Sequence, residues 1–377
     1  MEKIKVGLIG CGNISSVYFK NCLEFEHFDL SACADLDLER TKAQATRYDV
    51  KAYTIQELLN DEDIELVINL TTPKAHATVC IQALEAGKHV YTEKPLAVTR
   101  EEGRQILDVA KKKGLRIGSA PDTFLGGGIQ TAIHLIEKGE IGTPIGATAF
   151  MMSRGHEHWH PEPSFYYDVG GGPMFDMGPY YLTALIAMLG PIKRISGSAR
   201  ISYPERTITS EPKAGTKIQV QTPTHISGVL DFASGAIGTM ITSFDVFGGS
   251  TLPRMEVYGS EGTLLVPDPN TFGGPVFIRK RDEHEFVEVS LTHQYDQNSR
   301  GIGVADMAKS IQQQKAHRAN GDLAFHVLEA MHGFHDASST GTYYHMESTC
   351  LKPEPFPLNY HFSTRTNITN STFAEYD

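Results

Sequence analysis

Short apolar runs alternate with amphipathic stretches over the first third of the chain. The runs are four to seven residues long and consist mainly of apolar and β-branched residues, as in strands buried on both faces of a sheet. Parallel neighbours need crossover connections, so strands that alternate with helices predict a doubly wound parallel sheet. We therefore predict an α/β domain with six strands over residues 1–122. Five of these strands are the runs Val6–Ile9, Phe28–Ala34, Ile64–Leu70, His89–Thr92 and Arg116–Ala120.

The segments between these runs carry helix signals. The clearest begins at Thr99, with Glu101 and Glu102 in its first turn, Lys111 to Lys113 in its last, and Gly114 directly after it. Acidic residues at the start and basic residues at the end suit the helix dipole, and glycine commonly ends a helix. Four further helices are predicted in this domain, at Ile14–Phe25, Leu36–Tyr48, Ile55–Asn60 and His76–Ala86.

From residue 123 onward the pattern changes to long alternating runs separated by short turns. Such runs predict a large, mostly antiparallel open sheet. Four helical segments, at residues 128–138, 174–189, 304–314 and 323–338, would cover one face of it, which makes an α+β domain over residues 123–352. The predicted strands are Ile145–Met152, Ile192–Tyr203, His225–Phe232, Gly235–Phe247, Arg254–Tyr258 and Val276–Leu291.

Length and composition agree with two domains. A chain of 377 residues is too long for one ordinary core. Residues 353–377 are rich in Pro, Asn, Thr and aromatics without periodicity, so we expect a C-terminal tail whose docking place the sequence does not give. The five cysteines have neither metal nor disulfide spacing, and we interpret them as small core residues.

The charge balance excludes two classes of partner. Thirty-four basic residues against 45 acidic ones give a net charge of -11, which disfavours nucleic acid and anionic membranes. No apolar stretch is long enough to span a bilayer, and the N-terminal residues lack the pattern of a signal peptide. We therefore expect a cytoplasmic protein.

A glycine turn directly follows the first predicted strand. The motif runs from Gly10 through Gly12, Asn13 and Ile14 to Ser15. Glycines let the backbone turn tightly and let a phosphate approach, and the helix that follows offers free amides and the positive end of its dipole. This is the dinucleotide (Rossmann) fingerprint, with the small residue Ser15 in place of the third glycine. We predict that Gly10, Gly12, Asn13 and Ile14 contact the cofactor.

An acidic residue ends the second predicted strand. Asp35 lies roughly twenty residues beyond the turn, where a carboxylate accepts hydrogen bonds from the adenosine ribose and repels a 2′-phosphate. The position favours NAD over NADP. The competing interpretation is that Asp35 only caps the helix predicted at Leu36–Tyr48. Fingerprint and spacing together favour cofactor contact.

Polar residues also follow the next two strands. Thr71, Pro73 and His76 follow the third run, and Glu93 and Lys94 follow the fourth. Ligands of doubly wound sheets bind beyond the carboxyl ends of the strands. We therefore expect both groups at the same edge of the sheet as the glycine turn, and we assign them to cofactor binding.

Asp176 and Tyr180 are the best candidates for chemistry in the second domain. They lie four residues apart in a predicted helix and so share one face. The glycines before this helix would let it approach the cofactor closely. A phenol has an ordinary pKa of about 10, and a nearby ammonium such as Lys94 would lower it. We predict that Tyr180 accepts the substrate proton, Lys94 holds the substrate hydroxyl, and Asp176 orients the lysine or a second hydroxyl. The alternative is that Tyr180 and Tyr181 are core aromatics.

Three histidines stand at alternate positions between residues 156 and 160. On a strand, His156, His158 and His160 would share one face, a geometry compatible with zinc. We rank a substrate-binding wall for a sugar first, with Trp159 stacking on a pyranose face. A solvated loop ranks second, and a metal site ranks last, so we predict no resident metal.

Three motifs, in this order and in a chain of this length, resemble those of the Gfo/Idh/MocA family, which comprises glucose-fructose oxidoreductase, inositol dehydrogenase and rhizopine catabolism proteins. The resemblance covers the chain up to about residue 340. It implies that Pro95 follows a cis peptide bond and that the open sheet mediates homodimers or homotetramers. The motifs are Gly10-Cys-Gly12-Asn-Ile-Ser15, Glu93-Lys94-Pro95 and Gly170-Gly-Gly-Pro-Met-Phe-Asp176-Met-Gly-Pro-Tyr180.

The resemblance also implies roles for individual residues. Lys94 matches the catalytic lysine, Asp176 a residue of the substrate and catalytic network, and Tyr180 the acid/base, where many members carry histidine. Pro73 and His76 would lie near the nicotinamide. The departure at Tyr180 leaves a histidine between residues 156 and 160 as the alternative base.

Together these observations predict an NAD-dependent oxidoreductase that acts on a secondary hydroxyl of a sugar, glycoside or cyclitol. A close alternative keeps NAD bound and uses transient oxidation, at C3 for example, to cleave a glycosidic bond. An alternative of another class is a regulator that binds NAD and a sugar without chemistry. The joint presence of Lys94, Asp176 and Tyr180 favours an enzyme.

Overall fold

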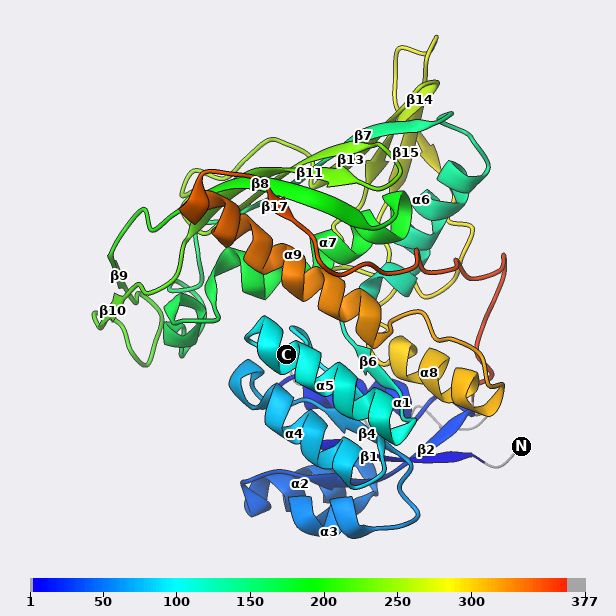
Figure 1. Ribbon diagram of the computed structural model, residues 1–377. Coiled ribbons are helices and arrows are strands. Elements are labelled where there is room, and N and C mark those ends of the chain that lie inside the picture. The colour runs from blue at the N-terminus through cyan, green and yellow to red at the C-terminus, as the bar shows by residue number, and fades with distance from the viewer. Residues whose placement is uncertain (1–2, 365–377) are drawn as a thin grey trace.

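The structure is a computed structural model that describes residues 3–364, and these residues form two domains (Figure 1). The first contains a six-stranded sheet in the order β3-β2-β1-β4-β5-β6, with all neighbouring strands parallel. This is the strand order of doubly wound dinucleotide-binding folds, so the predicted α/β architecture is confirmed. Its strands are β1 (Ile4–Ile9), β2 (Phe28–Ala34), β3 (Lys51–Tyr53), β4 (Leu66–Asn69), β5 (His89–Thr92) and β6 (Ile117–Ser119).

Local sequence signals set the ends of the helices in this domain. Thr54 and Thr99 each form a capping box with the glutamate three residues later, and Gly114 ends its helix in the left-handed conformation. Asp37 caps the second helix, which therefore starts two residues later than predicted. The helices are α1 (Ser15–Cys22), α2 (Leu38–Tyr48), α3 (Ile55–Asn60), α4 (Pro73–Glu85) and α5 (Arg100–Lys113).

The second domain contains a nine-stranded sheet in the order β16-β15-β14-β13-β7-β12-β11-β8-β17. Only the β7–β12 pair of the described residues is parallel in this sheet, so the predicted mostly antiparallel α+β domain is confirmed. Its strands are β7 (Pro144–Met152), β8 (Ile192–Arg200), β11 (His225–Phe232), β12 (Ile237–Ser243), β13 (Met255–Gly259), β14 (Gly262–Val266), β15 (Val276–Lys280), β16 (Val287–Val289) and β17 (Tyr344–His345).

Three of the described helices of this half, α6, α7 and α9, cover the face of this sheet that looks toward the first domain (Figure 1). The fourth, α8, packs mainly on α1 and β6 of the first domain, so the prediction that it covers this sheet is wrong. None of the helices in residues 3–364 is both long and apolar enough to cross a membrane. The helices of this half are α6 (Gly127–Glu137), α7 (Gly172–Leu189), α8 (Ile302–Gln312) and α9 (Gly321–Thr340), with short 3-10 turns η1 (Thr123–Leu125) and η2 (Ser164–Tyr167).

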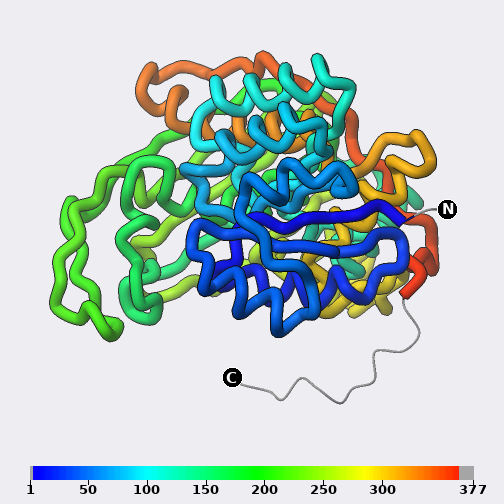
Figure 2. Tube along the Cα trace, turned by 90° about the horizontal axis from the view of Figure 1, so that it is seen from below, coloured from blue at the N-terminus to red at the C-terminus, as the bar shows by residue number. Residues whose placement is uncertain are grey.

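Several strands differ from the sequence prediction. None of the predicted runs contains β3, which is short and lies at the exposed edge of its sheet. The long run predicted at Val276–Leu291 is two strands, because an exposed turn separates β15 from β16. The unpredicted strands β9 (Glu205–Thr207) and β10 (Lys217–Gln219) form a separate hairpin, which projects at the left of Figures 1 and 2.

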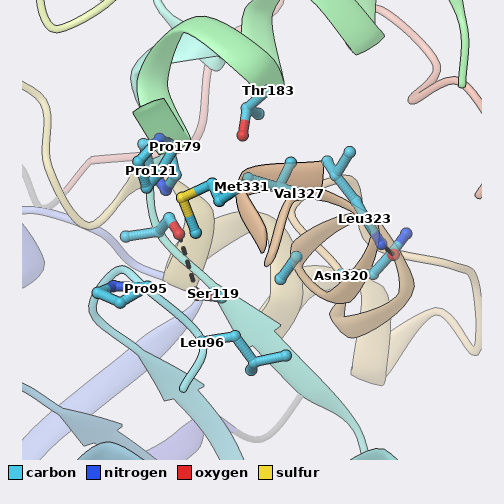
Figure 3. A pocket seen from close by; sticks show the side chains of 12 residues that line it. Pro95, Leu96, Ser119, Pro121, Pro179, Thr183, Asn320, Leu323, Val327 and Met331 are labelled. Carbon is cyan, nitrogen blue, oxygen red and sulfur yellow. Dashed lines mark hydrogen bonds between the residues drawn. The ribbon is translucent and has the colours of Figure 1, made fainter. Parts of the chain in front are cut away.

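The two domains meet along α7 and α9. Helix α9 packs on α5 and β6 of the first domain and on β8 of the second. Figure 2 shows the first domain from below, in front of the second. A cavity of only about 10 Å³ remains at the joint, which is about the space of one water molecule, so the packing is close (Figure 3). Pro95, Pro121, Pro179, Val327 and Met331 are among its lining residues.

The last described segment ties the two domains together. Phe356 and Phe362 are buried, and the Phe356 amide donates to Gln130 Oε1 of α6 at 2.7 Å. The Glu26 amide of the first domain donates to the Ser363 carbonyl at 3.0 Å. The predicted tail therefore docks against both domains as far as residue 364, and its residues 365–377 lie outside the described part of the chain.

A buried histidine at this joint predicts a pH-dependent stability. Burial, with a smaller contribution from Arg116, lowers the pKa of His317 to about 4, while its Nε2 donates to the Ile117 carbonyl of β6 at 3.2 Å. The unfolded chain, with a histidine pKa of about 6.5, binds more protons between pH 4 and 6.5. The free energy of unfolding should therefore rise with pH across this window, by up to about 3 kcal/mol from this residue.

We expect His317→Gln to flatten the dependence of Tm on pH between 4.5 and 7, measured by differential scanning fluorimetry. The exposed His284 provides a matched control, since His284→Gln should keep the wild-type slope. An unchanged slope in His317→Gln would contradict the assignment.

Candidate active site

The glycine turn has the shape that a dinucleotide needs. Gly10 has a φ of +103°, and a Cβ there would lie 2.6 Å from the carbonyl carbon of Leu70, so both backbone conformation and space require glycine. A Cβ at Gly12 would meet no atom within 4 Å, so its backbone borders open space. Asn13 and Ile14 are exposed beside it. The turn can therefore receive a phosphate closely.

The first turn of α1 has no side-chain cap. Ile14 occupies the N-cap position and makes no side-chain capping hydrogen bond. The Ser15 hydroxyl donates to the Gly12 carbonyl at 2.7 Å, so it stabilises the turn and does not cap the helix. Amides without a side-chain acceptor at a helix start favour a pyrophosphate. Turn and helix together fit the phosphates of a dinucleotide.

Asp35 lies at the end of β2, beside this turn. Its Oδ2 accepts from the Cys11 amide at 2.7 Å and its Oδ1 accepts from the Asp37 amide at 2.9 Å. The helix-capping role that competed with cofactor binding belongs to Asp37. Each oxygen of Asp35 retains acceptor capacity for a ribose hydroxyl. Arg40 Nη1 stands 3.6 Å from Asp35 Oδ2 and is the nearby cation.

The residues after β4 and β5 hold the edge of the sheet in shape. The Thr71 hydroxyl donates to Asn69 Oδ1, and Pro73 begins α4. His76 is fully buried, with Nδ1 2.6 Å from the Pro95 carbonyl and Nε2 2.9 Å from the Thr71 carbonyl. Its ring therefore links the two loops from within and is not exposed to a ligand.

Hydrogen bonds from two other groups of the protein fix the Glu93 carboxylate. Its Oε1 accepts from the Tyr18 hydroxyl of α1 at 2.8 Å, and its Oε2 accepts from the Lys94 amide at 2.9 Å. These two contacts connect the helix that follows the glycine turn to the loop that carries Lys94. The carboxylate therefore helps to place Lys94.

Lys94 and Asp176 meet across the two domains. Lys94 Nζ donates to Asp176 Oδ1 at 2.9 Å and to the Asp176 carbonyl at 2.5 Å. The same Nζ lies 5.2 Å from the centre of the Tyr180 ring, and the peptide bond to Pro95 is cis. Both side chains of the ion pair are 16% exposed. The structure thus brings together the three residues that the sequence selected for chemistry.

The charges of these groups support one another. Burial by itself lowers the pKa of Lys94, but Asp176, Tyr180 and Glu93 together outweigh it and raise that pKa above its ordinary value. Burial raises the pKa of Tyr180, and the cationic Lys94 opposes this by favouring the phenolate. Lys94 is therefore a permanent cation at neutral pH, placed where it assists loss of a proton from Tyr180.

Arg300 is a site residue that the sequence analysis missed. Its guanidinium lies close to the Tyr180 side chain and, like Lys94, opposes the burial that raises the pKa of the phenol. Asn270 Oδ1 accepts from Arg300 Nη2 at 3.0 Å, which fixes the guanidinium. Arg300 precedes α8, and the amides of Gly301 and Gly303 both donate to the buried Asp122. No motif surrounds it, so sequence patterns give no signal for this contact.

Only one of the three alternate histidines reaches the site. Residues 155–160 form a turn and not a strand, so the three side chains do not share a face. His156 Nε2 lies 3.5 Å from Asp176 Oδ2, and burial is the main cause that lowers the pKa of its imidazole. His158 lines a separate hollow, and His160 Nδ1 accepts from the Glu162 amide. Trp159 is mostly exposed, with its ring centre 5.5 Å from that of His156.

Within residues 3–364, no group of three or more His, Cys, Asp or Glu side chains is arranged to hold a metal ion. The turn explains this at residues 156–160, because it separates His158 from His156.

A cleft opens between the domains beside the Lys94–Asp176 pair. Its volume is about 340 Å³, and both Lys94 and Asp176 line it. Tyr180, only 8% exposed, is not among the lining residues described, so its ring is covered by its neighbours. The other lining residues are Thr72, Pro73, Lys74, Pro95, Val98, Phe165, Tyr166, Val169, Gly170, Gly171 and Phe175.

The glycines before α7 serve the protein's own packing. A Cβ at Gly170 would lie 2.8 Å from Val98 Cγ1, and one at Gly171 would lie 2.6 Å from the Phe165 carbonyl. The glycines therefore bring the two walls of the cleft close together. The close approach of this helix to the cofactor, which the sequence predicts, stays a prediction.

Comparison with known families finds two matches along the chain. Residues 4–120 match the family described as "Oxidoreductase family, NAD-binding Rossmann fold", and residues 129–265 match the "GFO/IDH/MocA C-terminal domain". The two matches follow each other in the same order as the two sheets.

Curated relatives match parts of the chain. An uncharacterized oxidoreductase of Schizosaccharomyces pombe is 32% identical over 199 residues, which cover 50% of this chain and 53% of the relative. Levoglucosan dehydrogenase of Pseudarthrobacter phenanthrenivorans is 24% identical over 291 residues, which cover 70% of this chain and 74% of the relative. The chain thus spans about half the length of the first of these relatives.

A solved NAD-binding oxidoreductase from Klebsiella pneumoniae has the same fold. It superposes with a TM-score of 0.79 at 21% identity, covering 91% of this chain and 99% of its own. At this identity the likeness establishes the fold alone.

The geometry of Asp35 predicts the choice between NAD and NADP. Asp35→Asn keeps a hydrogen-bond acceptor for the Cys11 amide and removes the charge that repels a 2′-phosphate, leaving Arg40 to attract it. We expect the ratio of the Kd for NADP to the Kd for NAD to fall at least about fivefold, since one charge at this distance contributes on the order of 1 kcal/mol or more. Fluorescence titration with both nucleotides measures it.

Asp37→Asn is the matched control, because asparagine caps a helix as well as aspartate does. Its nucleotide selectivity should equal that of the wild type. A wild-type protein that binds NADP more tightly than NAD would contradict the role of Asp35.

Proposed function

Because the chain belongs to the Gfo/Idh/MocA oxidoreductase family and carries an NAD-binding Rossmann domain, we propose that it is an NAD-dependent oxidoreductase that transfers a hydride between a secondary hydroxyl of a sugar, glycoside or cyclitol and nicotinamide. The observation that carries the proposal is the meeting of Lys94, Asp176 and Tyr180 beside an interdomain cleft. The similarity to levoglucosan dehydrogenase supports a carbohydrate substrate.

In this proposal the first domain binds the nucleotide. Gly10, Gly12 and the start of α1 receive the pyrophosphate, and Asp35 holds the adenosine ribose. When bound, NAD supplies the hydride acceptor. Asn13 and Ile14 border the same turn from the solvent side.

The second domain supplies proton transfer. Loss of hydride from a carbon requires its hydroxyl to lose a proton, and a positioned base speeds this step by about 10²–10⁴-fold. Lys94 is a cation next to both the cleft and Tyr180, so it can hold the substrate oxygen and favour the phenolate. Asp176 keeps the ammonium in place with its carboxylate and its carbonyl. Tyr180 then takes the proton.

The remaining expectations from the sequence stay predictions. The sheet face that the helices leave uncovered supports a homodimer or homotetramer. On this face lie the apolar side chains of Phe150, Ile237 and Ile241, which alternate along β7 and β12 with residues that face inward. Light scattering tests the oligomeric state, and cell fractionation tests the cytoplasmic location.

Removal of the ammonium or the phenol should abolish most of the activity. We expect Lys94→Ala and Tyr180→Phe each to lower kcat by at least about a hundredfold, the usual scale for acid-base catalysis. The assay is NADH absorbance with a panel of sugars, glycosides and cyclitols. Tyr181→Phe, at the buried neighbouring tyrosine, should retain activity within a few-fold of the wild type.

Wild-type turnover by Tyr180→Phe would move the base to His156, which His156→Ala would then test. Measurable binding of NAD and sugar without reduction of NAD by any member of the panel would favour a non-catalytic regulator. Product formation without net release of NADH would favour the glycoside-cleaving alternative.

The position of Arg300 beside Tyr180 predicts that its replacement shifts the pH profile of kcat. A cation beside Tyr180 favours the phenolate, so its removal raises the pKa of the phenol. We expect Arg300→Met to move the acidic limb of the kcat profile upward by about one pH unit, the lower end of the effect of a neighbouring charge. The exposed Arg279 of β15 supplies the control, since Arg279→Met should leave the profile in place. A limb that does not move would show that Arg300 acts on structure alone.

A further inference from the structure

The cleft differs in chemistry between its inner end and its mouth. At the inner end lie Lys94 and Asp176, with His156 3.5 Å from the carboxylate of Asp176. These groups can hold the hydroxyls of one ring. The outward walls are formed mainly by aromatic, aliphatic and proline side chains.

One wall is a stack of rings that runs outward from the inner end. The His156 ring stacks on Tyr166 with 3.8 Å between centres and an angle of 13°. Tyr166 lies against Phe165 at 4.0 Å, and Phe165 is 50% exposed. Phe165 and Tyr166 both line the cleft. The stack therefore offers a wall of ring edges from the neighbourhood of Asp176 to the solvent, where it ends at the exposed ring of Phe165.

The rest of the apolar lining is mainly aliphatic. Pro73 and Val98 come from the first domain, and Val169 comes from the second and is 60% exposed. Among the described lining residues at the mouth of the cleft, Lys74 is the one with a charged side chain. Its Nζ lies 2.5 Å from Asp168 Oδ2, so the charge is paired. Exposed apolar side chains gathered around a pocket mark a ligand that is itself apolar at that place.

We propose that the substrate is a glycoside with an aromatic aglycone, in which the sugar lies at Lys94 and Asp176 and the aromatic ring lies between Phe165, Tyr166 and Val169. This inference rests on the proposed function and narrows its substrate class. A second sugar at the mouth would cover less of this apolar surface than an arene of the same size, because hydroxyls occupy its edges. An aromatic ring suits this lining, since aromatic pairs, edge-to-face pairs included, stabilise each other beyond the area they bury.

The test compares substrates that share one oxidisable sugar. Phenyl glycosides, methyl glycosides, disaccharides and the free sugars are assayed with NAD and the wild-type protein. We expect kcat/KM for the phenyl glycoside to exceed that for the methyl glycoside and for the disaccharide at least tenfold. A methyl glycoside or disaccharide oxidised equally well would overturn the aromatic aglycone and leave the proposed function intact. Failure of every member, free sugars included, would remove the proposed function and this inference with it.

Two valines of similar exposure locate the effect. Val169→Asp places a charge against the aromatic ring and should lower the ratio of kcat/KM between phenyl and methyl glycoside at least fivefold. Val287, 56% exposed on β16, is the control, and Val287→Asp should leave the ratio unchanged. Phe165→Ala, which removes an exposed ring without touching the core, should also lower the ratio. A ratio that Val169→Asp and Phe165→Ala both leave unchanged would contradict the placement.

Discussion

The hydrogen-bonded ion pair between Lys94 and Asp176 is the interaction on which the rest of the site depends. An ammonium that is largely removed from water must be paired, and here its partner belongs to the other domain. The same ion pair therefore joins the domains and places two charged side chains in the lining of the cleft. Because Asp176 precedes Tyr180 by one helical turn, fixing the carboxylate also fixes the phenol beside the ammonium.

The supporting residues act through that pair. Glu93 connects the lysine loop to α1, and His76 connects it to the start of α4. From the other side, Asp122 holds the glycines after Arg300, and Arg300 contacts Tyr180. Nucleotide binding and proton transfer are thus built on one set of buried contacts, and the polar groups of the site are placed before any ligand arrives.

The sequence predicted those features of the molecule that follow a regular period or a motif of fixed spacing. Strand and helix periods gave both sheets, and the motifs selected Lys94, Asp176 and Tyr180 although 81 residues separate the first two positions in the chain. It failed where irregular backbone decides. The His156 carbonyl accepts from the Trp159 and His160 amides, and this turn keeps the three histidines from lying on one strand face. Arg300 and the ring wall at Phe165 and Tyr166 lie in irregular or 3-10 segments, where no period links a residue to the site.

The C-terminal segment has a consequence for how the molecule is made. Phe356 is anchored near α6, and the backbone of Ser363 is anchored at Glu26, so one segment that follows both sheets in the chain contacts both domains. During synthesis, each domain can collapse around its own sheet, but these bridging contacts form only after the segment that makes them has been synthesised. The joint is therefore completed later than either sheet, and a chain that stops before this segment exposes the apolar surface on which Phe356 packs.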